Sequence, residues 1–520
     1  MKNKNDIYKT KKYKAGAVIL IILVLLCSIG FPKPSYADSQ EITISTPEES
    51  ESEVEDSEKD YAKEISTFSL AIAKIGSSSY TTAKAGKYTV LTVESDDDNE
   101  LYYNCQKALN YAKENATVTN PCKVIIPAGS YNLKASLSIY SNTYLYAKGA
   151  YIKNRHGSRM LRNGKTIEAA IEKWTGYSKF KNITIDGGTW NGNGTSKSEQ
   201  FSNFRFGRVT GLIIKNLKVL NNTGAHHIEI AAAKNVRITN CYFSGYKSGG
   251  IKGGKEAIQL DIMLGKDTFR SFGKYDKATC YDIVIKNNVF KNVSRGVGTH
   301  SVSSGRYYNN ITISNNRFIN LKSYAINGLN FRNCVISHNV ISNVGSGIYM
   351  QSTNNKSTMK YYIHHNNIKV GKMFGGQAFG MRFSGIKSAI IYSNKIISGG
   401  KYGIGLVDKS NIRNLKNNIV RRTSNKSAIY IGKGSKSLVK TLKSITVVKV
   451  SYKTGIIVGK TQANEIIGLK INNSKIARTK VKKNSKFVIK SNKISKKGEK
   501  MTIWFTDKKN NLIKVSKIIK

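Results

Sequence analysis

Three short segments between residues 226 and 300 decide the fold: His227-Ile-Glu-Ile-Ala231, Ala257-Ile-Gln-Leu-Asp261 and Gly296-Val-Gly-Thr-His300. Apolar and polar residues alternate in them with a period of two. This period places Ile258 and Leu260 on one face and Gln259 and Asp261 on the other. The alternation predicts β-strands that are buried on one side.

A second phrase, of the form Asn-x-x-Ile-x-Asn-Asn-x-Phe, recurs between strand segments of this kind. Clear copies begin at Asn235, Asp282, Asn310 and Asn333. Successive copies start 22 to 28 residues apart, with one longer step between residues 235 and 282 that contains an insertion. Self-similarity at this period indicates a solenoid, in which each coil stacks on its neighbour.

The coils are too short for helical repeats and carry Asn and Gly at their corners. We therefore predict an all-β protein whose residues 80–435 form a right-handed parallel β-helix, with Ile and Phe side chains inside. Asn tolerates the left-handed backbone conformation that corners require. A leucine-rich repeat is the alternative solenoid, but the chain lacks the Leu-x-x-Leu-x-Leu phrase.

The N-terminal 79 residues have a different composition. Residues 1–37 combine several lysines, an apolar run from Ala17 to Phe31 and a small-x-small site at Ser35-Tyr36-Ala37. This pattern predicts a cleaved signal peptide, and hence a secreted, extracellular or cell-surface protein. An uncleaved membrane anchor would need about 20 apolar residues, more than the run contains. Residues 38–79 begin with a dense acidic, serine-rich stretch and are predicted to be a disordered linker.

Two further phrases resemble a known superfamily. Leu101–Asn115 suits a short helix with Asp96-Asp97-Asp98 at its positive end, and Lys123-Val-Ile-Ile-Pro-Ala-Gly-Ser-Tyr131 follows. This order resembles the opening of the pectate-lyase-like β-helices, which implies that the helix caps the solenoid. Thr184-Ile-Asp-Gly-Gly-Thr-Trp-Asn-Gly-Asn-Gly194 is similar to a phrase of glycoside hydrolase family 28, the polygalacturonase-like proteins. The resemblance covers residues 88 to about 435, and hydrolases, lyases, epimerases and noncatalytic binders share this architecture.

The repeat stops after residue 435. Residues 440–520 alternate apolar and polar residues between turns, which predicts a small antiparallel β-sandwich similar to bacterial Ig-like modules. This segment holds 22 Lys and Arg residues against three acids, a large part of the net charge of +52. An exported chain meets teichoic acids and anionic glycans, and no nucleic-acid-binding signature is present. We predict attachment to cell-envelope polyanions, with a solubilising end-cap as the alternative, and no binding of nucleic acid.

Cysteine and histidine spacings give little support for metal sites. Five cysteines follow the predicted signal peptide without CxxC spacing, so neither a zinc site nor a full disulfide framework is indicated; a Cys105–Cys122 bond would tie the predicted helix to the first strand. His364 and His365 are adjacent, and neighbours on a strand point to opposite faces, so we expect them not to share a metal ion. His338 is expected to be structural, in an Asn-ladder position.

Strands in register place equivalent positions of neighbouring coils about 4.8 Å apart, so aligned repeats predict columns of outward side chains. The predicted columns are Glu229, Gln259, Gly298, Asn327, Tyr349 and Gly380, and then Ala231, Asp261, His300, Leu329, Gln351 and Arg382. Asp261 and His300 become vertical neighbours, with Glu229 one coil away on a diagonal. Glycines 296 and 298 suggest an open floor beside His300. The alternative is that these polar side chains merely contact solvent on an outward face and have no further function.

We predict catalytic roles for Glu229, Asp261 and His300. The predicted substrate-binding residues are His227, Glu256, Gln259, Arg295, Asn327 and Arg382. One carboxyl group would protonate a glycosidic oxygen, the other would activate water, and His300 would tune Asp261 or hold the sugar. The carboxylate separation, about 5 to 9.5 Å, leaves retaining and inverting chemistry open.

The function predicted from these residues is that of a glycoside hydrolase, acting as a monomer on an anionic polysaccharide with no required cofactor. One alternative is a uronic-acid lyase or epimerase, for which Ca²⁺ is a candidate cofactor. The other is a noncatalytic glycan-binding surface protein.

Overall fold

The computed structural model of this chain describes residues 79–94, 100–194, 201–222, 224–246, 255–265, 269–353, 360–371, 378–398, 400, 402–422, 429–437, 445–461, 466–472, 474–482, 486–494, 496–506 and 512–519. The predicted signal peptide, nearly all of the predicted linker and the acidic run Asp96–Asp98 lie outside these residues.

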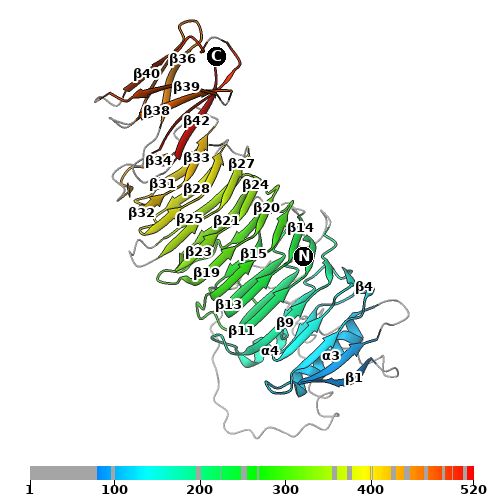
Figure 1. Cartoon of the computed structure of the whole chain (residues 1–520). Coiled ribbons are helices and arrows are strands. Elements are labelled where there is room, and N and C mark those ends of the chain that lie inside the picture. Colours follow the sequence, from blue (N-terminus) through cyan, green and yellow to red (C-terminus); the bar gives the residue numbers. More distant parts are fainter. Residues whose placement is uncertain are drawn as a thin grey trace, which may run out of the picture. The chain divides into compact units, whose positions relative to one another are not determined.

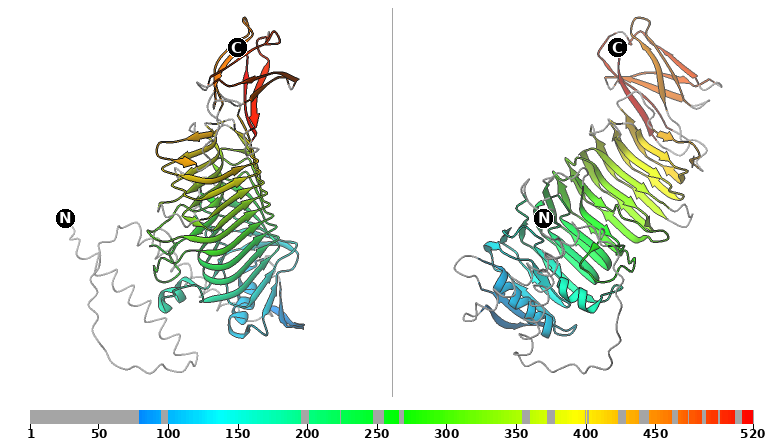
Figure 2. Two further views of the ribbon diagram at one scale, coloured as in Figure 1. Left: turned by 60° about the vertical axis from the view of Figure 1, so that its left-hand side comes forward. Right: turned by 180° about the vertical axis from the view of Figure 1, so that it is seen from behind.

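The strands from β2 (Tyr88–Val93) to β35 (Lys436–Ser437) form a solenoid of parallel strands, stacked coil on coil (Figure 1). Each full coil contributes one strand to each of three columns, as the views from two other sides also show (Figure 2).

The first column consists of β5 (Leu137–Ile139), β8 (Leu161–Asn163), the first half of β11 (Phe204–Lys215), the first half of β13 (Ile228–Thr239), β15 (Glu256–Asp261), β18 (Arg295–Gly298), β21 (Tyr324–Leu329), β25 (Ser346–Gln351), β28 (Phe379–Ser384), β31 (Tyr402–Val407) and β34 (Ile429–Ile431).

The second column consists of β2 (Tyr88–Val93), β3 (Cys122–Ile125), β6 (Thr143–Tyr146), β9 (Phe180–Asp186), the second halves of β11 and β13, β16 (Tyr281–Lys286), β19 (Tyr308–Ser314), β22 (Phe331–Arg332), β23 (Cys334–Ser337), β26 (Tyr361–His364), β29 (Ala389–Tyr392), β32 (Asn411–Lys416) and β35 (Lys436–Ser437).

The third column is a separate sheet of β4 (Gly129–Leu133), β7 (Ala150–Asn154), β10 (Thr189–Asn191), β12 (Lys218–Asn222), β14 (Tyr242–Tyr246), β17 (Val289–Lys291), β20 (Arg317–Ile319), β24 (Val340–Val344), β27 (Asn367–Val370), β30 (Lys395–Ser398) and β33 (Ile419–Arg422).

The recurring Asn-Asn-x-Phe phrase builds the corner between the second and third columns. The first Asn takes a left-handed backbone conformation, with φ of +59° at Asn287 and +55° at Asn315. The second Asn is buried and donates its amide to the next Asn of a ladder; Asn339 to Asn366 is 2.9 Å. The members of this ladder are Asn288, Asn316, Asn339, Asn366, Asn394 and Asn418. The Phe ends inside, where Phe290 and Phe318 stack with centroids 4.7 Å apart.

A helix caps the N-terminal coils. The apolar face of α3 (Tyr102–Asn115) packs on β2, β3 and β5, and the first strand, β1 (Tyr80–Ala85), pairs antiparallel with β2. Gln106 of α3 satisfies the backbone of Ser138 in both directions, at 2.8 and 3.1 Å. A second helix, α4, spans Thr166–Glu172. The predicted Cys105–Cys122 bond is wrong, since all five described cysteines are buried free thiols.

Antiparallel strands follow the solenoid, as predicted, and they form two sheets. One contains β36 (Thr446–Ser451), β37 (Ile456–Lys460) and β40 (Lys486–Lys490). The other contains β38 (Ile466–Ile471), β39 (Ser474–Lys480), β41 (Lys500–Thr506) and β42 (Leu512–Ile518). In addition, β42 pairs in parallel with β33, so the third-column sheet continues into this segment. No helix in the described part of the chain is long and apolar enough to cross a membrane.

Candidate functional site

The outward side chains of the first column, from β11 to β34, form what we call the site face. Strand pairing aligns Glu229 with Gln259, Gln259 with Gly298 and Gly298 with Asn327, which is the predicted order. The column then continues through Tyr349 to Arg382, rather than to Gly380 as predicted. Tyr349 pairs with Arg382, so Gly380 lies two residues before the site-face position, where a Cβ would meet the side chain of Ile396 in the interior.

Glu229 is held in a buried ion pair. Its Oε2 accepts hydrogen bonds from Ser202 Oγ and from Arg205 Nε, each at 2.8 Å. Burial opposes ionisation of this carboxyl group, but the charges of Arg205 and His226 and the hydrogen bonds outweigh it and lower the pKa of Glu229. Arg205 also lies over the ring of Phe269, 4.2 Å from its centroid. Glu229 is therefore an ionised carboxylate that is shielded from solvent and already engaged by Arg205 and Ser202.

Asp261 is in the opposite state. Its side chain is almost completely buried, and the Ile262 N–H donates to its Oδ1 at 2.8 Å. Burial, followed by the negative charge of Glu229, raises the pKa of Asp261 to about 7. The two carboxyl groups thus separate into one that is ionised and one that holds its proton below neutral pH.

Glu256 forms the centre of a second polar group. It is fully buried; its Oε1 accepts from Arg295 Nη1 and its Oε2 from His300 Nδ1, both at 3.1 Å. His226 Nδ1 contacts its main-chain carbonyl at 2.7 Å. Burial opposes ionisation here too, but the hydrogen bond from His300 and the nearby positive charges lower the pKa of Glu256.

His300 does not continue the sheet as the predicted vertical neighbour of Asp261. Strand β18 ends at Gly298, so the chain leaves the sheet before His300, and the imidazole turns back to Glu256 at the start of β15 rather than to Asp261. Its ring stacks near that of His226, with centroids 5.8 Å apart. His300 is nevertheless the most solvent-exposed member of the group, at 37% of its side chain.

His227 lies in the interior rather than on the site face. Its Nε2 is 3.1 and 3.3 Å from the carbonyls of Gly245 and Ser244, and its ring packs edge-on against Phe243. Burial lowers its pKa to about 4, so the imidazole is neutral. The prediction that it binds substrate does not agree with this placement.

The predicted open floor is also wrong. A Cβ on Gly296 would lie 2.3 Å from the carbonyl oxygen of Ala325, and one on Gly298 the same distance from that of Asn327. These glycines therefore allow close approach to β21 instead of leaving space. Between Glu229 and Gly298, the buried amide of Gln259 has no hydrogen-bond partner among the described residues.

An aromatic ladder continues the site face beyond Arg295. The Arg295 guanidinium lies 5.7 Å from the Tyr324 ring, which lies 5.4 Å from the Tyr349 ring. The remaining contacts are Tyr349 to Arg382 at 4.8 Å, Arg382 to Phe379 at 5.0 Å, Phe379 to Tyr402 at 6.1 Å and Tyr402 to Tyr430 at 4.4 Å.

The sequence predicts substrate-binding roles for Arg295, Asn327 and Arg382 but does not predict this ladder of rings and guanidinium groups. Aromatic residues near the starts of successive first-column segments were the available signal. Asn327 is buried between coils, donating to the Thr299 carbonyl at 3.2 Å and accepting from Gln351 at 3.0 Å.

Three arginines that were not predicted hold the insertion after Asp261 against the N-terminal coils. Arg208, fully buried, donates to Asp276 Oδ2 at 2.6 Å and to the carbonyl of Phe272 at 3.1 Å. Arg162 donates to the Ser271 carbonyl at 2.7 Å, and Arg205 to that of Arg270 at 3.0 Å. The insertion therefore flanks the carboxyl groups of Glu229 and Asp261.

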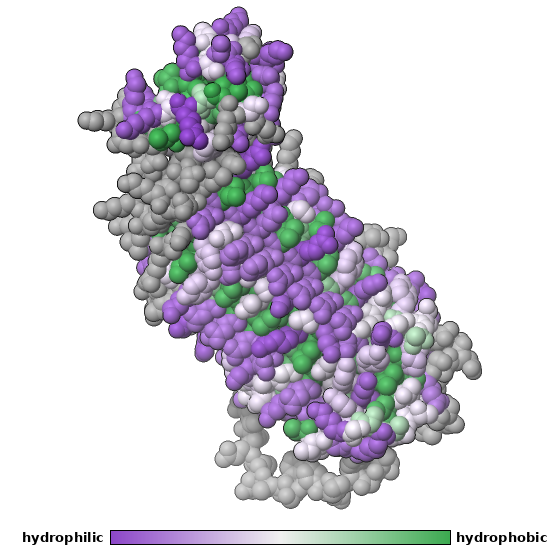
Figure 3. Space-filling view, in the orientation of Figure 1, coloured by the Kyte–Doolittle hydropathy of each residue, from purple (hydrophilic) through white to green (hydrophobic). Residues whose placement is uncertain are grey.

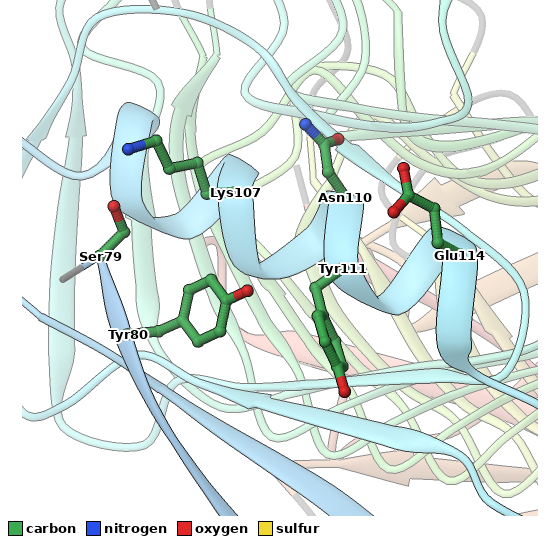
Figure 4. A pocket seen from close by; sticks show the side chains of 6 residues that line it. All are labelled: Ser79, Tyr80, Lys107, Asn110, Tyr111 and Glu114. Atoms are coloured by element: carbon green, nitrogen blue, oxygen red, sulfur yellow. The ribbon is translucent and has the colours of Figure 1, made fainter. Parts of the chain in front are cut away.

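Figures 3 and 4 show two further features of the surface. The face of the solenoid seen in Figure 3 is mostly hydrophilic, with apolar residues scattered between. A cavity of about 520 Å³ lies between β1 and α3 in the N-terminal cap (Figure 4). Its lining residues are Ser79, Tyr80, Lys107, Asn110, Tyr111 and Glu114.

His364 and His365 do not point to opposite faces, so the expected reason why they could not share a metal ion is absent. His364 is the last residue of β26, and His365 follows at φ +54°, a left-handed turn that brings both imidazoles together. Their Nδ1 atoms are 2.9 Å apart. His338 occupies the same exposed corner position one coil earlier, not the buried Asn ladder.

Residues 302–446 match the family described as "Right handed beta helix region". The fold is a right-handed parallel β-helix. Over 248 residues the chain is 27% identical to plasmin and fibronectin-binding protein A of Streptococcus pneumoniae. The match covers 42% of this chain and 34% of the relative, so the chain spans about a third of that relative's length.

Solved structures with the same fold share little sequence with this chain. The S. pneumoniae surface protein and adhesin PfbA is 19% identical, with 66% of this chain and 97% of that chain covered and a TM-score of 0.49. A hyperthermoactive exopolygalacturonase from Thermotoga maritima is 13% identical, with 66% and 90% covered and a TM-score of 0.44.

Proposed function

We propose that this protein is displayed outside the cell and binds polysaccharide along its site face. The aromatic ladder carries the proposal, because it brings partly exposed tyrosines and guanidinium groups into one continuous row; its stacked rings present their edges rather than their faces. Tyrosine hydroxyls and arginine guanidinium groups both donate hydrogen bonds to the hydroxyl and carboxylate oxygens of sugars. From β15 to β34 the face spans six steps of about 4.8 Å, roughly 29 Å, which suits an extended chain.

Binding accounts for the geometry better than hydrolysis does. Glu229 and Glu256 are both buried and both engaged by cationic partners, so neither presents an open carboxylate to a substrate. The curated relative is, by its printed name, a plasmin- and fibronectin-binding protein, which supports placing this chain at a cell surface.

The test is a glycan array probed with the protein, followed by titration of the glycan that binds best. Tyr349→Ala and Arg382→Ala should each weaken that glycan about 10-fold or more, as expected for central contacts. Tyr362→Ala is the matched control, because this exposed tyrosine lies on second-column strand β26. Unchanged affinity in both ladder variants, or binding of plasmin or fibronectin but of no glycan, would contradict the proposal.

Hydrolysis is a second candidate because the pKa values of the two carboxyl groups shift in opposite directions, upward for Asp261 and downward for Glu229. A carboxyl group with a pKa of about 7 can donate a proton to a leaving oxygen near neutral pH. If hydrolysis occurs, the protein releases reducing ends from an anionic glycan, the rate falls as pH rises through about 7, and Asp261→Asn abolishes it. Asp282→Asn, at a corner where other coils carry Asn, is the control. Full activity in Asp261→Asn would exclude this role.

The donor set does not fit Ca²⁺. Both oxygens of Glu256 accept from Arg295 and His300, and Oε2 of Glu229 accepts from Arg205. A calcium ion prefers several carboxylate and carbonyl oxygens without such competition. We infer that a calcium-dependent lyase is the weakest of the three functions.

A further inference from the structure

Three histidines meet at one corner of the solenoid, far along the chain from the carboxyl groups of the site face. They are His338, after β23, and His364 and His365, at the end of β26 one coil later. Strand pairing places His364 opposite Ser337, so His365 lies opposite His338. The corner therefore brings the three imidazoles together through backbone geometry that repeats in every coil.

These histidines are not required by the corner itself. The left-handed position occupied by His338 and His365 holds Asn in the other coils of this corner, at residues 216, 240, 287, 315 and 417, and Ser at 393. Asn adopts this conformation more readily than most residues. Two successive coils thus replace a suitable corner residue with imidazole, and a third imidazole replaces a serine next to it.

The ring geometry resembles an open ligand set. The rings of His338 and His365 are parallel, with an interplanar angle of 1° and centroids 4.9 Å apart. His364 stands perpendicular to both, at 5.5 and 5.2 Å. One nitrogen from each of the three residues lies within 4.8 Å of the others. Tetrahedral zinc, with Zn–N bonds of about 2.0–2.1 Å, holds its nitrogens about 3.3 Å apart, so the parallel rings of His338 and His365 must tilt toward each other for both to reach one ion.

The surroundings favour an ion over a purely structural cluster. In the structure the Nδ1 atoms of His364 and His365 share one hydrogen bond at 2.9 Å, in which one imidazole must donate. A metal ion would replace that proton and accept both lone pairs. Tyr392 stacks on His364 at 4.6 Å and holds its ring. His338 and His365 are exposed, so solvent can supply a fourth ligand.

We propose that His338, His364 and His365 form a binding site for one divalent transition-metal ion of the zinc type, with water in the fourth position. Imidazole ligands suit Zn²⁺, Cu²⁺ and Ni²⁺ and do not suit Ca²⁺ or Mg²⁺. The ion would link the corners of two neighbouring coils. It would also bind the folded protein only, and therefore raise its thermal stability.

The test uses the untagged protein, titrated with Zn²⁺ against a chromogenic chelator, with a thermal unfolding curve at each metal concentration. One equivalent should bind and raise the unfolding midpoint. His338→Asn, His365→Asn and His364→Ser install residues that this corner already carries in other coils, so they should fold. Each should lower Zn²⁺ affinity by more than about 100-fold, because loss of a direct ligand exceeds loss of a supporting partner.

His300→Asn is the control, since His300, His226 and Glu256 form the other histidine group of the described structure. This variant should bind Zn²⁺ as the parent does, and Mg²⁺ should not compete. The assignment is overturned if the parent binds no stoichiometric Zn²⁺, if the corner variants bind it unchanged, or if only His300→Asn loses it.

Discussion

Asp261 shows how one residue's ionisation depends on its coil neighbours. Its register partner Ala231 is two residues from Glu229, whose negative charge acts together with burial to keep Asp261 protonated. A carboxyl group whose pKa is raised on folding binds more protons in the native state than in the unfolded state. The free energy of unfolding therefore decreases as pH rises from about 4 to about 7 and levels off above that.

This sign gives a stability prediction for Asp261→Asn. Asn cannot ionise and can still accept the hydrogen bond from the Ile262 N–H. The variant should be more stable than the parent above pH 7, by at most about 4 kcal/mol, and should lack the decrease between pH 4 and 7. Thermal unfolding across that range measures it. A variant that is less stable at pH 8 would show that Asp261 is ionised and satisfied in the fold.

At the scale of an element, the Asn-Asn-x-Phe phrase builds a ladder of hydrogen bonds along the corner between the second and third columns. Each buried Asn accepts from the previous coil and donates to the next, so its amide is satisfied without water. Asn339 accepts from the backbone N–H and the Nδ2 of Asn316, at 3.0 and 3.1 Å, and donates to the Ile313 carbonyl at 2.9 Å. The ladder thereby fixes the register of the coils from β16 to β33.

Asn339→Ala should accordingly be costly. It leaves two buried donors of Asn316 without their acceptor and the Ile313 carbonyl without this donor, and each unsatisfied group costs about 1–3 kcal/mol. We expect a loss of about 3 kcal/mol or more, measured as a lower unfolding midpoint. Asn343→Gly is the control, because Asn343 makes an exposed ladder bond to Asn320 and has φ +51°, which Gly adopts freely. Equal losses in the two variants would contradict the argument.

At the scale of the whole molecule, the antiparallel segment after residue 445 carries a large positive net charge, because lysine and arginine far outnumber its three acids. It is joined to the solenoid through the β33–β42 pairing, so a truncated protein would expose the edge of β33. Charge substitution is therefore a better test of envelope attachment than deletion.

Replacing Lys482, Lys490, Lys493 and Lys496 together with Gln should weaken binding to cell-envelope preparations. Binding of the parent should also decrease steeply with salt, because exposed charges are screened over about 8 Å at physiological ionic strength. The matched control carries the same change at four exposed lysines of the solenoid, Lys286, Lys291, Lys369 and Lys395. Salt-independent binding, or equal binding by both variants, would show that this segment is not an electrostatic anchor.

The repeat by itself determined the fold class and the register that aligns Glu229, Gln259 and Gly298. It could do so because a period of two and a corner Asn are local properties. The directions of His227, His300 and His365 were decided only in the tertiary structure, where strands end or turn through left-handed corners.

The burial of the carboxyl groups and the identity of their charged partners could not be predicted from the local sequence pattern either. Alternation marks Glu229 and Asp261 as outward, but the insertion after Asp261 returns to flank them, held by contacts such as Arg208 to Asp276, 68 residues apart. Which charge neutralises which depends on this long-range return of the chain. The physical reason is that side-chain direction follows from neighbouring residues, whereas ionisation and access follow from whatever else packs on the same face.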